Sequence, residues 1–405
     1  MGVRLMGQDS LDSEASTSSS LVSSRSCTNG RGPHKCIAIL HGQALHVITL
    51  ALSGDVLYAG SNHGDIRAWD HPDMQEATKF GSGRAAVKCI VVVGNRVISA
   101  HQDHKIRVWR RSKCQPQEYR LVSTLPSIKD YIANFLPAKN YVQVRRHHKS
   151  LWINHNDSIS CLAVGNGVLY SGSWDKSVKV WRLSDFKCLE SLCGHIDAVN
   201  ALAVDKQHDL LYTGSGDTTV KVYQRQDLGN KKSQHVLVAT LEVKSPVNAL
   251  ALSPEGALLY TAQSDKTVTI WKMKEIDGDR QWTAVGTLRG HRLAILCLTI
   301  MSNLVITGSA DTTVRVWRRD AEDVHTCLSV MVGHTGPVKS LCVLSDMAMG
   351  ALVYSGSMDG DIRVWWLPED ETDLLSSDDS SPDSPVVINW RSSSISTGSP
   401  LCRSV

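Results

Sequence analysis

The sequence lacks long hydrophobic runs. Its first thirty residues contain no apolar stretch, so no signal peptide is expected, and no segment is apolar enough for a transmembrane helix. Lipid anchors are not expected either. Met6 stands where myristoylation requires Ser or Thr, and Arg403 and Ser404 are not the aliphatic residues of a prenylation motif. We therefore expect no association with a membrane.

Paired cysteines are also missing. The sequence has 11 cysteines, an odd number, and none shows the Cys-x-x-Cys spacing of zinc or redox sites. We expect no disulfide framework, no metal and no cofactor, and we place the protein in a reducing compartment, the cytoplasm or the nucleus. Cys89, Cys161 and Cys297 occupy equivalent strand positions and are expected to act as small buried hydrophobic residues.

Catalytic motifs are missing as well. There is no glycine-rich phosphate loop before a helix, no Gly-x-Ser-x-Gly elbow and no His-Glu-x-x-His motif. The glycines instead stand with Ser and Asp in short turns between apolar runs, which is typical of β-hairpins. We therefore predict that the protein is not an enzyme.

What the sequence does contain is one pattern present seven times. Residues 338–365 show it most fully: they follow Gly333-His334, and two apolar runs flank a turn of Ser, Gly and Asp. The copies end at Trp69, Trp109, Trp181, Tyr223, Trp271, Trp317 and Trp365, with spacings of 40, 72, 42, 48, 46 and 48 residues. A period in the forties with a Gly-His start and a Trp end predicts four strands per repeat.

Four repeats share a set of polar residues. Repeats three, four, six and seven each have a His before the first strand, an Asp in the turn and an aromatic residue at the end. The sets are His155, Asp175 and Trp181; His195, Asp217 and Tyr223; His291, Asp311 and Trp317; and His334, Asp359 and Trp365. Because a buried His or Asp is costly unless it is paired, we predict a structural hydrogen-bonded network in each repeat.

The other repeats depart from this set. His63 replaces the turn Asp of the first repeat, and Gly83 and Val243 replace the His of the second and fifth. We expect these repeats to be held mainly by apolar packing and by their neighbours.

Composition divides the chain into three parts. Residues 1–33 are rich in Ser and residues 367–405 are acidic and rich in Ser, so both are expected to be disordered tails. Residues 34–366 carry the repeats, and the strand-like stretch 35–41 is expected to pair with the last repeat and close a ring. The second tail contains three candidate phosphorylation sites that we hypothesise to be regulatory: Ser381-Pro382, Ser384-Pro385 and Ser399-Pro400.

The long spacing between the second and third repeats indicates an insertion at residues 110–152. Residues 126–137 predict a short helix with a capping box formed by Ser127 and Asp130, and with Pro137 at its end. The apolar face of this helix is expected to pack on the wall of the repeat domain. It consists of Ile128, Tyr131, Ile132, Phe135 and Leu136.

The same insertion is strongly basic. Residues 110–150 hold nine Lys or Arg against two acidic residues, and Arg145 and Arg146 are candidates for binding an acidic partner. That partner could be an acidic protein segment, the acidic tail of the chain itself or nucleic acid. Nucleic acid is the least favoured of the three, because few aromatic residues accompany the basic ones.

The seven repeats resemble the WD-repeat family over residues 35–366. The resemblance implies an all-β fold: a single seven-bladed WD-repeat β-propeller closed by an N-terminal strand, with a short helix in the insertion between blades 2 and 3. Residues 124–131 and 139–147 and Ser173-Trp174-Asp175 look like the plant WD-repeat proteins of the JINGUBANG type. That resemblance implies a non-enzymatic scaffold or regulatory adaptor of plants, which binds other proteins such as a transcription regulator or signalling complex. We expect one propeller per complex.

Partner binding is expected at the end of the ring where the turns and the Gly-His loops meet. Trp174 and Met358 are large apolar residues on polar turns, as interface anchors often are, and Asn62 and Gln102 take the equivalent places in blades 1 and 2. Arg292 follows Gly290-His291 and is a further candidate. The alternative role of Trp174 is to shield the polar network of its own blade.

A ubiquitin-ligase substrate receptor is a third class of function. Many propellers of that class carry Trp-Asp-x-Arg at the end of a repeat, and the resemblance would then imply a ligase partner. Here the ends read Trp69-Asp70-His71-Pro72, Trp109-Arg110-Arg111 and Trp317-Arg318-Arg319. None fits the motif, so we favour the scaffold over the receptor.

Overall fold

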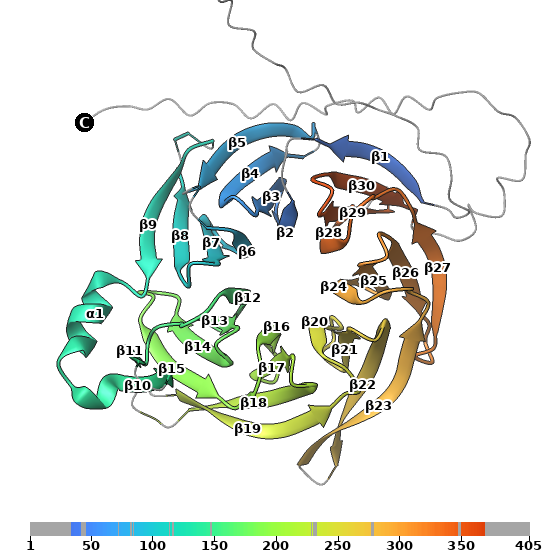
Figure 1. Cartoon of the computed structure of the whole chain (residues 1–405). Helices are drawn as coiled ribbons and strands as arrows, with labels where there is room; N and C mark the ends of the chain where they lie inside the picture. The colour runs from blue at the N-terminus through green and yellow to red at the C-terminus, as the bar shows by residue number, and fades with distance from the viewer. Residues whose placement is uncertain are drawn as a thin grey trace, which may run out of the picture. The chain divides into compact units, whose positions relative to one another are not determined.

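Seven four-stranded antiparallel sheets form a ring within the part of the chain that the computed structural model describes (Figure 1). That part is residues 34–368 without 42–45, 72, 82, 84, 113, 116, 146–147, 228, 230–232, 277–278 and 347–349. The predicted seven-bladed β-propeller is therefore confirmed. Leu367, predicted to begin the second tail, is instead the buried last residue of a strand. Residues 1–33 and 369–405, with the Ser-Pro sites, lie outside the described residues.

Blades 1 to 4 each present their strands in sequence order from the centre of the ring outward. Blade 1 consists of β2 (Val47–Ser53), β3 (Val56–Ser61), β4 (Asp65–Asp70) and β5 (Gln75–Gly81). Blade 2 consists of β6 (Val87–Val93), β7 (Arg96–His101), β8 (Ile106–Arg111) and β9 (Tyr119–Leu125). Blade 3 consists of β12 (Ile159–Gly165), β13 (Val168–Ser173), β14 (Ser177–Arg182) and β15 (Cys188–Cys193). Blade 4 consists of β16 (Val199–Asp205), β17 (Leu210–Ser215), β18 (Thr219–Asp227) and β19 (Ser233–Glu242).

Blades 5 and 6 follow the same order, and blade 7 takes its outer strand from the other end of the chain. Blade 5 consists of β20 (Val247–Leu252), β21 (Leu258–Gln263), β22 (Thr267–Ile276) and β23 (Asp279–Arg289). Blade 6 consists of β24 (Ile295–Met301), β25 (Leu304–Ser309), β26 (Val314–Arg319) and β27 (His325–Met331). Blade 7 consists of β28 (Val338–Asp346), β29 (Gly350–Ser357), β30 (Ile362–Leu367) and β1 (Lys35–Leu40).

The ring is closed by the pairing of β1 with β30. The register runs from Lys35 opposite Trp366 to Leu40 opposite Ile362. This is the closing strand predicted from residues 35–41. It covers an edge of blade 7 that would otherwise be open to pairing with another chain.

The hydrophobic core is divided into seven clusters, one between each pair of neighbouring blades. The aromatic residue that ends each repeat faces the preceding blade. Trp181, for example, is 1% exposed and belongs to the same cluster as Ile98 and Val108 of blade 2. Large aromatic side chains dominate such interfaces because each buries roughly 150–250 Å². The spacing of these residues therefore sets the positions of the blade interfaces.

The glycine before the turn serves the same packing between blades. A Cβ atom at Gly214 would lie 2.6 Å from Cγ1 of Val247 in the next blade, closer than carbon atoms approach one another. Gly60, Gly308 and Gly356 meet the first residue of the following inner strand in the same way. In these blades the glycine thus makes room for the close approach of the next blade, whereas blades 2 and 5 have Ala100 and Ala262 at the same position.

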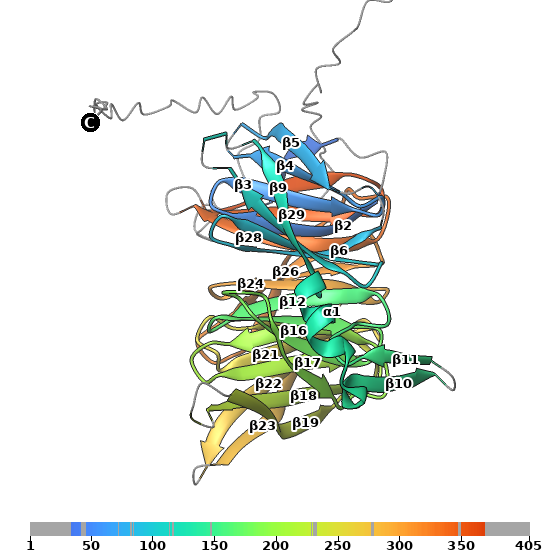
Figure 2. The same ribbon diagram turned by 90° about the vertical axis from the view of Figure 1, so that its left-hand side faces the viewer.

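The chain segment that connects blade 2 to blade 3 contains an insertion, which lies on the outside of the ring (Figure 2). Residues 110–125 still belong to β8, β9 and their hairpin, and the added elements begin after Pro126. They are α1 (Ile128–Phe135), a 3-10 turn (Ala138–Asn140), β10 (Tyr141–Arg145) and β11 (His148–Leu151). The predicted capping box is present: Ser127 Oγ accepts the backbone N–H of Asp130, and the Asp130 carboxylate accepts the N–H of Ser127 at 2.9 Å.

The expected packing of the apolar helix face on the wall is wrong for four of its five residues. Ile128, Ile132, Phe135 and Leu136 are 79, 71, 64 and 87% exposed, and only Tyr131 packs against the cluster between blades 2 and 3. The helix is held instead through Asn134. Its backbone oxygen accepts a bond from Asn140, and its Oδ1 accepts the indole N–H of Trp152 at 3.3 Å. The spacing of the apolar residues predicted an apolar face of the helix. The helix is nevertheless attached to the rest of the insertion through the polar contacts of Asn134.

Candidate functional site

Four blades contain a buried hydrogen-bonded chain that leads to the turn, and in three of them it starts at the closing tryptophan. In blade 3, the indole of Trp181 donates to Ser171 Oγ at 2.9 Å, Ser171 Oγ lies 2.8 Å from Nε2 of His155, and Nδ1 of His155 lies 3.0 Å from Asp175. An indole can only donate, so Ser171 Oγ accepts from Trp181; with a neutral His155, the hydroxyl donates to Nε2, and Nδ1–H donates to the carboxylate. The side chain of His155 is 1% exposed.

The same chain recurs around the ring. Equivalent His–Asp distances are 2.8 Å for His195 and Asp217, 3.0 Å for His291 and Asp311, and 2.9 Å for His334 and Asp359. Trp317 and Trp365 donate to Thr307 and Ser355 at 3.0 and 2.8 Å. Blade 4 ends in Tyr223, which has no indole N–H to donate, so its chain begins at Thr213, 2.8 Å from His195.

Each turn carboxylate also accepts the backbone N–H of the residue after the histidine. Asp217 accepts from Ile196 at 2.9 Å, and Asp311 accepts from Arg292 at 2.7 Å. Burial alone would raise the pKa of Asp217, but bonds from Thr219, Ile196 and His195 outweigh it and lower the pKa to about 2. The carboxylate therefore stays ionised and ties the Gly-His loop to the turn.

Burial lowers the pKa of the network histidines His155, His195 and His291, even though a carboxylate lies beside each of them. They are neutral near pH 7, so one ring nitrogen accepts from the serine or threonine hydroxyl and the other donates to the carboxylate. A neutral histidine with both ring nitrogens bonded inside the protein has no free nitrogen for general base catalysis. The network's role here is to fix the loops and turns at one end of the ring, which we call the turn face.

Every inner strand carries a β-bulge close to the turn face. The register shifts across one residue in all seven blades: Ile48, Lys88, Ser160, Asn200, Asn248, Leu296 and Lys339. A bulge re-aims the side chain of the inserted residue. Asn200 and Asn248 donate to the carbonyl oxygens of Val247 and Ile295 in the next blade, both at 2.9 Å, so their side chains latch neighbouring blades together.

Lys88 and Lys339 stand at two of these bulges and form no such latch. No hydrogen bond or ion pair joins either ammonium group to another described residue. The Nζ atom of Lys88 lies 5.7 Å from the ring centroid of Trp174, a cation–π distance. Burial and the like charge of Lys339 lower the pKa of Lys88, so the two lysines act on one another across blades.

Among the candidates from the sequence, Trp174 is the most exposed aromatic anchor on the turn face. Its side chain is 46% exposed, while its backbone N–H is fixed by the carbonyl oxygen of Ser158 at 3.0 Å. Arg292 is exposed on the loop of blade 6, and Met358 is half-buried, with its backbone oxygen bonded to His46. Blades 3 and 6 are separated by two others, so Trp174 and Arg292 mark different parts of the turn face.

The structure brings two other candidates together. Asn62 and Gln102 line one hollow of about 520 Å³ between the turns of blades 1 and 2. Oδ1 of Asn62 is buried without a hydrogen-bond partner among the described residues, and Gln102 is exposed beside it. Of the two basic candidates, Arg146 lies outside the described residues, and only the backbone of Arg145, in β10, is described.

Sequence reasoning missed three residues of the turn face. Ile196 and Leu293 are 78 and 50% exposed; Ile196 directly follows a network histidine, as Arg292 does, and Leu293 comes after Arg292. Applying the logic used for Arg292 to every Gly-His loop would have found Ile196. Lys88 would have required knowledge of the bulge, because a lysine inside an apolar strand gives no sign of where its side chain points.

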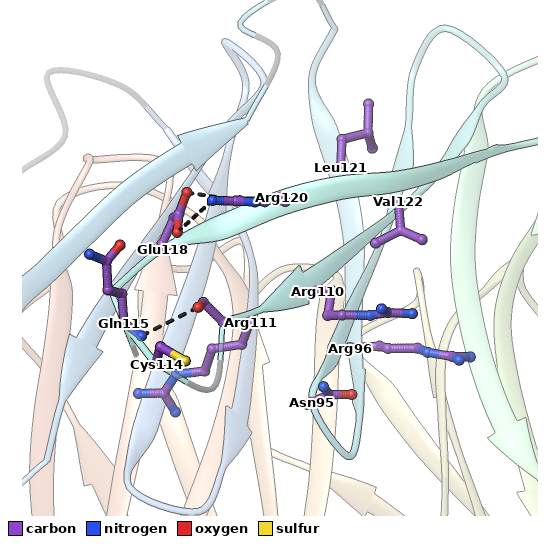
Figure 3. Close-up of a pocket in the computed structure, with 11 residues that line it drawn as sticks. Asn95, Arg96, Arg110, Arg111, Cys114, Gln115, Glu118, Arg120, Leu121 and Val122 are labelled. Carbon is purple, nitrogen blue, oxygen red and sulfur yellow. Dashed lines mark hydrogen bonds and ion pairs between the residues drawn. The ribbon is translucent and has the colours of Figure 1, made fainter. Parts of the chain in front are cut away.

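A second concave region lies on the outer half of blade 2, away from the turn face. It has a volume of about 990 Å³, and Arg96, Arg110, Arg111 and Arg120 line it together with Leu121 and Val122 (Figure 3). Arg120 forms an ion pair with Glu118 at 2.9 Å. This region contains the beginning of the basic stretch 110–150.

Neither a metal centre nor a membrane span is found in the described part of the chain. No three His, Cys, Asp or Glu side chains are grouped there as a metal would require. None of its helices has the length and apolar character needed to cross a membrane.

Comparison with known proteins agrees with the architecture. The family model "WD domain, G-beta repeat" (WD40) matches residues 147–182, 186–224, 234–272, 282–318 and 325–365. These segments cover the closing strands of blades 3 to 7. Blades 1 and 2, which lack the His–Asp pair, lie outside them.

Matches to individual proteins cover parts of each chain. Over 174 residues, the chain is 25% identical to WD repeat-containing protein pop2 of Schizosaccharomyces pombe, covering 39% of this chain and 23% of that protein. It is 31% identical over 156 residues to myosin heavy chain kinase C of Dictyostelium discoideum, covering 37% and 16%. It is 22% identical over 166 residues to the F-box/WD-40 repeat-containing protein At5g21040 of Arabidopsis thaliana, covering 40% and 26%. The chain thus spans less than a quarter of the first two relatives.

A solved structure supports the fold alone. The computationally designed Ika8 protein superposes with a TM-score of 0.56 at 24% identity, covering 81% of this chain and 98% of that chain.

Proposed function

The chain belongs to the WD40 repeat family, and we propose that it is a non-enzymatic scaffold that binds other proteins through its turn face. The observation that carries this proposal is the position of Trp174. An indole that is 46% exposed on a polar turn gains nothing from its contact with water. Buried against a partner, it would supply a large apolar contact, as tryptophans do at the energetic centres of interfaces.

The turn face is also held in place before any partner arrives. The turn of Trp174 is fixed by the bond from its N–H to Ser158 and by Asp175, which accepts the N–H of Asn156 at 2.8 Å. A surface that is already ordered loses little conformational entropy on binding, so more of the contact energy is retained as affinity. Ile196 and Leu293 extend the exposed apolar area to blades 4 and 6.

The biological setting of the scaffold is part of the same proposal. The resemblance of residues 124–131 and 139–147 to the JINGUBANG-type proteins supports a regulatory adaptor in plants, acting in the cytoplasm or the nucleus. A transcription regulator or a signalling complex is the proposed kind of partner. One propeller per complex is proposed, because β1 pairs with β30 of the same chain and so closes the ring without a second copy.

Affinity capture from plant extract followed by mass spectrometry tests the proposal. The bait is the full chain, compared with a Trp174→Ala/Arg292→Glu variant and with an Ile132→Ala/Leu136→Ala variant as a matched control. The control removes exposed apolar area from the outer side of α1, where Ile132 and Leu136 are 71 and 87% exposed. The proposal expects a set of proteins that binds the wild type and the control and is lost from the turn-face variant.

Equal capture by all three baits would sink the assignment of the turn face. The variant must also remain folded, which thermal unfolding checks. If Trp174→Ala alone lowers the Tm strongly and leaves capture intact, the indole serves to shield the network of blade 3 rather than to bind a partner.

A further inference from the structure

Three arginines stand directly opposite one another on adjacent strands of blade 2. The register pairs Arg96 of β7 with Arg110 of β8, and Arg110 with Arg120 of β9. Residues directly opposite in antiparallel strands project from the same face of the sheet, so three arginines start from one face of blade 2, and the guanidinium of Arg120 turns toward Glu118. Figure 3 shows Arg96 and Arg110 extending side by side in the same direction, with Val122 on the same side.

The first of these arginines is peculiar to blade 2. The equivalent strand position holds an aliphatic residue in each of the other blades: Val56, Val168, Leu210, Leu258, Leu304 and Leu352. Packing therefore favours an apolar side chain there. Arg96 fits because its guanidinium lies over the ring of Phe186, 5.3 Å from the centroid, and donates to the carbonyl oxygen of Leu183 at 3.1 Å. These contacts fix the charge at the seam between blades 2 and 3.

The second arginine lacks the carboxylate partner that the basic residues at the equivalent positions of blades 3 and 5 have. Arg182 of blade 3 lies 3.6 Å from Asp185, and Lys272 of blade 5 lies 2.6 Å from Asp323. Arg110 is exposed, and no described residue forms a hydrogen bond or an ion pair with it. The one carboxylate that lines the hollow, that of Glu118, is bound to Arg120 through both of its oxygens.

Like charges in direct opposition weaken a sheet, and here no acidic side chain neutralises the middle one. A ligand with several anionic oxygens would remove this repulsion. A phosphate group carries close to two negative charges and three acceptor oxygens, which matches two guanidinium groups better than a single carboxylate does. The hollow of about 990 Å³ leaves room for such a group.

We propose that the hollow beside Arg96, Arg110 and Arg120 binds a phosphorylated segment of a partner protein, as a second binding site distinct from the turn face. The exposed apolar side chains of Leu121 and Val122 favour a peptide over a free anion as the ligand. They are 50 and 48% exposed at the rim of the hollow, and they offer apolar contacts to the residues that flank a phosphate. β9 is the outermost strand of its sheet. The backbone groups along its outer edge can therefore pair with an extended segment of the partner protein.

The test uses the full chain and a fluorescein-labelled library of nine-residue peptides with a central phosphoserine, beside the same library with serine. Fluorescence anisotropy at physiological salt gives the averaged affinity. The wild type should bind the phosphorylated library at least about tenfold more tightly, since a charge-assisted fork of hydrogen bonds is lost with the phosphate. Single-stranded DNA of equal charge serves as the polyanion control.

Arg110→Gln is the main variant because that side chain is exposed and forms no hydrogen bond or ion pair with a described residue. It should reduce phosphopeptide affinity by about tenfold, and Arg110→Lys should restore only part of it, because a lysine lacks the planar fork. Arg182→Gln is the matched control at the equivalent position of blade 3, and it should bind as the wild type does. In phosphate-free buffer, the Tm of Arg110→Gln should equal or exceed that of the wild type, since one repulsive charge is gone.

Inorganic phosphate alone provides a second measurement. Compared with chloride at the same ionic strength, it should raise the Tm of the wild type and of Arg182→Gln more than that of Arg110→Gln. Equal affinity for the two libraries, unchanged binding by Arg110→Gln, or tighter binding of DNA than of the phosphopeptides would each overturn the proposal. None of these results bears on the capture experiment with Trp174, so the two binding sites stand or fall separately.

Discussion

Nε2 of His101 lies 2.8 Å from Ser99 Oγ, the same hydroxyl that accepts the indole N–H of Trp109 at 2.9 Å. His101 is at the end of strand β7, whereas the network histidines of blades 3, 4, 6 and 7 come from the loop before the inner strand. Its other ring nitrogen lies 3.2 Å from the carbonyl oxygen of Ala85. Blade 2 thus contains a polar network of its own, and the expectation that apolar packing mainly holds it must be corrected.

Blade 5 also lacks the loop histidine, and the side-chain amide of Gln263 takes its place in the hydrogen-bonded network. Gln263 occupies the position equivalent to His101, and its Nε2 donates to Thr269 Oγ1 at 2.6 Å and to Thr261 Oγ1 at 3.4 Å. Trp271 donates to the same Thr261 hydroxyl at 3.4 Å. In blades 3, 4, 6 and 7, this position holds a serine, and the loop histidine fills the space. A long polar residue at the strand end therefore replaces a missing loop histidine.

Replacing His101 with alanine should destabilise the protein. The change leaves buried Ser99 and Trp109 with fewer hydrogen-bond partners, so the free energy of unfolding should fall by about 1–3 kcal/mol. Urea denaturation followed by tryptophan fluorescence measures it. His63→Ala, at the exposed turn of blade 1, is the control and should change stability by less than about 0.5 kcal/mol. Equal effects of the two substitutions would argue against a network in blade 2.

Acid should destabilise the protein below pH 6.5. Burial is the main reason why the pKa of His101 falls to about 4 in the folded state, with the charge of Arg107 adding to the effect, against 6.5 when unfolded. Because the unfolded chain then binds more protons, stability declines as the pH falls from 6.5 towards 4, by at most about 3 kcal/mol for this residue. The pKa of Asp217 and that of Asp311 are lowered to about 2, so a further loss follows below pH 3.8.

His101→Gln removes the contribution of His101 to the pH dependence of stability, because glutamine does not titrate. Blade 5 has a glutamine at the equivalent position, so the residue should fit there. The free energy of unfolding, measured in urea at pH 7.5 and 5.0, should fall less for the variant than for the wild type. An identical fall in both proteins would show that His101 is not the group that takes up the proton.

The asparagine latches of the inner strands should contribute to stability, whereas the bulge lysine should not. Asn248→Ala removes the bond to the Ile295 carbonyl between blades 5 and 6 and should cost about 1 kcal/mol. Lys88→Ala, at the equivalent bulge of blade 2, removes no hydrogen bond and relieves repulsion with Lys339, so it should cost less. Thermal unfolding of the two single variants decides between these outcomes, and a larger loss for Lys88→Ala would contradict the assignment.

The exposed face of α1 should tolerate charge. Ile132→Glu and Leu136→Glu change residues that are 71 and 87% exposed, so the Tm should stay within measurement error of the wild type. Tyr131→Ala should be destabilising, since its ring packs against the cluster between blades 2 and 3 and its hydroxyl accepts a bond from Lys105 at 3.0 Å. Destabilisation by the two glutamates would restore the expectation that this face packs on the wall.

The parts of the fold that could be predicted depend on residues that recur in every repeat. The closing aromatic residues give the number of blades because each one must fill an interface, and residues 35–41 could be assigned to blade 7 because nothing after Trp366 resembles its missing strand. Features that occur once were harder to predict. The amphipathic period of α1 does not say that Asn134 attaches the helix.

On the candidate surface, the positions of Trp174 and Arg292 could be predicted, because both residues belong to recognisable turns or loops of the repeat. The residues that contact them could not be predicted, because they come from other parts of the chain. Lys88 reaches Trp174 from another blade, and the opposition of Arg96, Arg110 and Arg120 depends on strand register, which the spacing of the repeats does not specify.

The pairing of Lys35 with Trp366 also constrains the order of events when the protein is made. The first strand of the propeller leaves the ribosome early, and its partner is the last strand to be synthesised. At roughly 5–20 residues per second, the 330 residues between these two take roughly 20–60 seconds to translate. During that time β1 has no native partner, while the inner blades can already pack against one another. Completion of the ring therefore awaits nearly the whole chain, and β1 spends that interval as an unpaired strand that other chains or chaperones can bind.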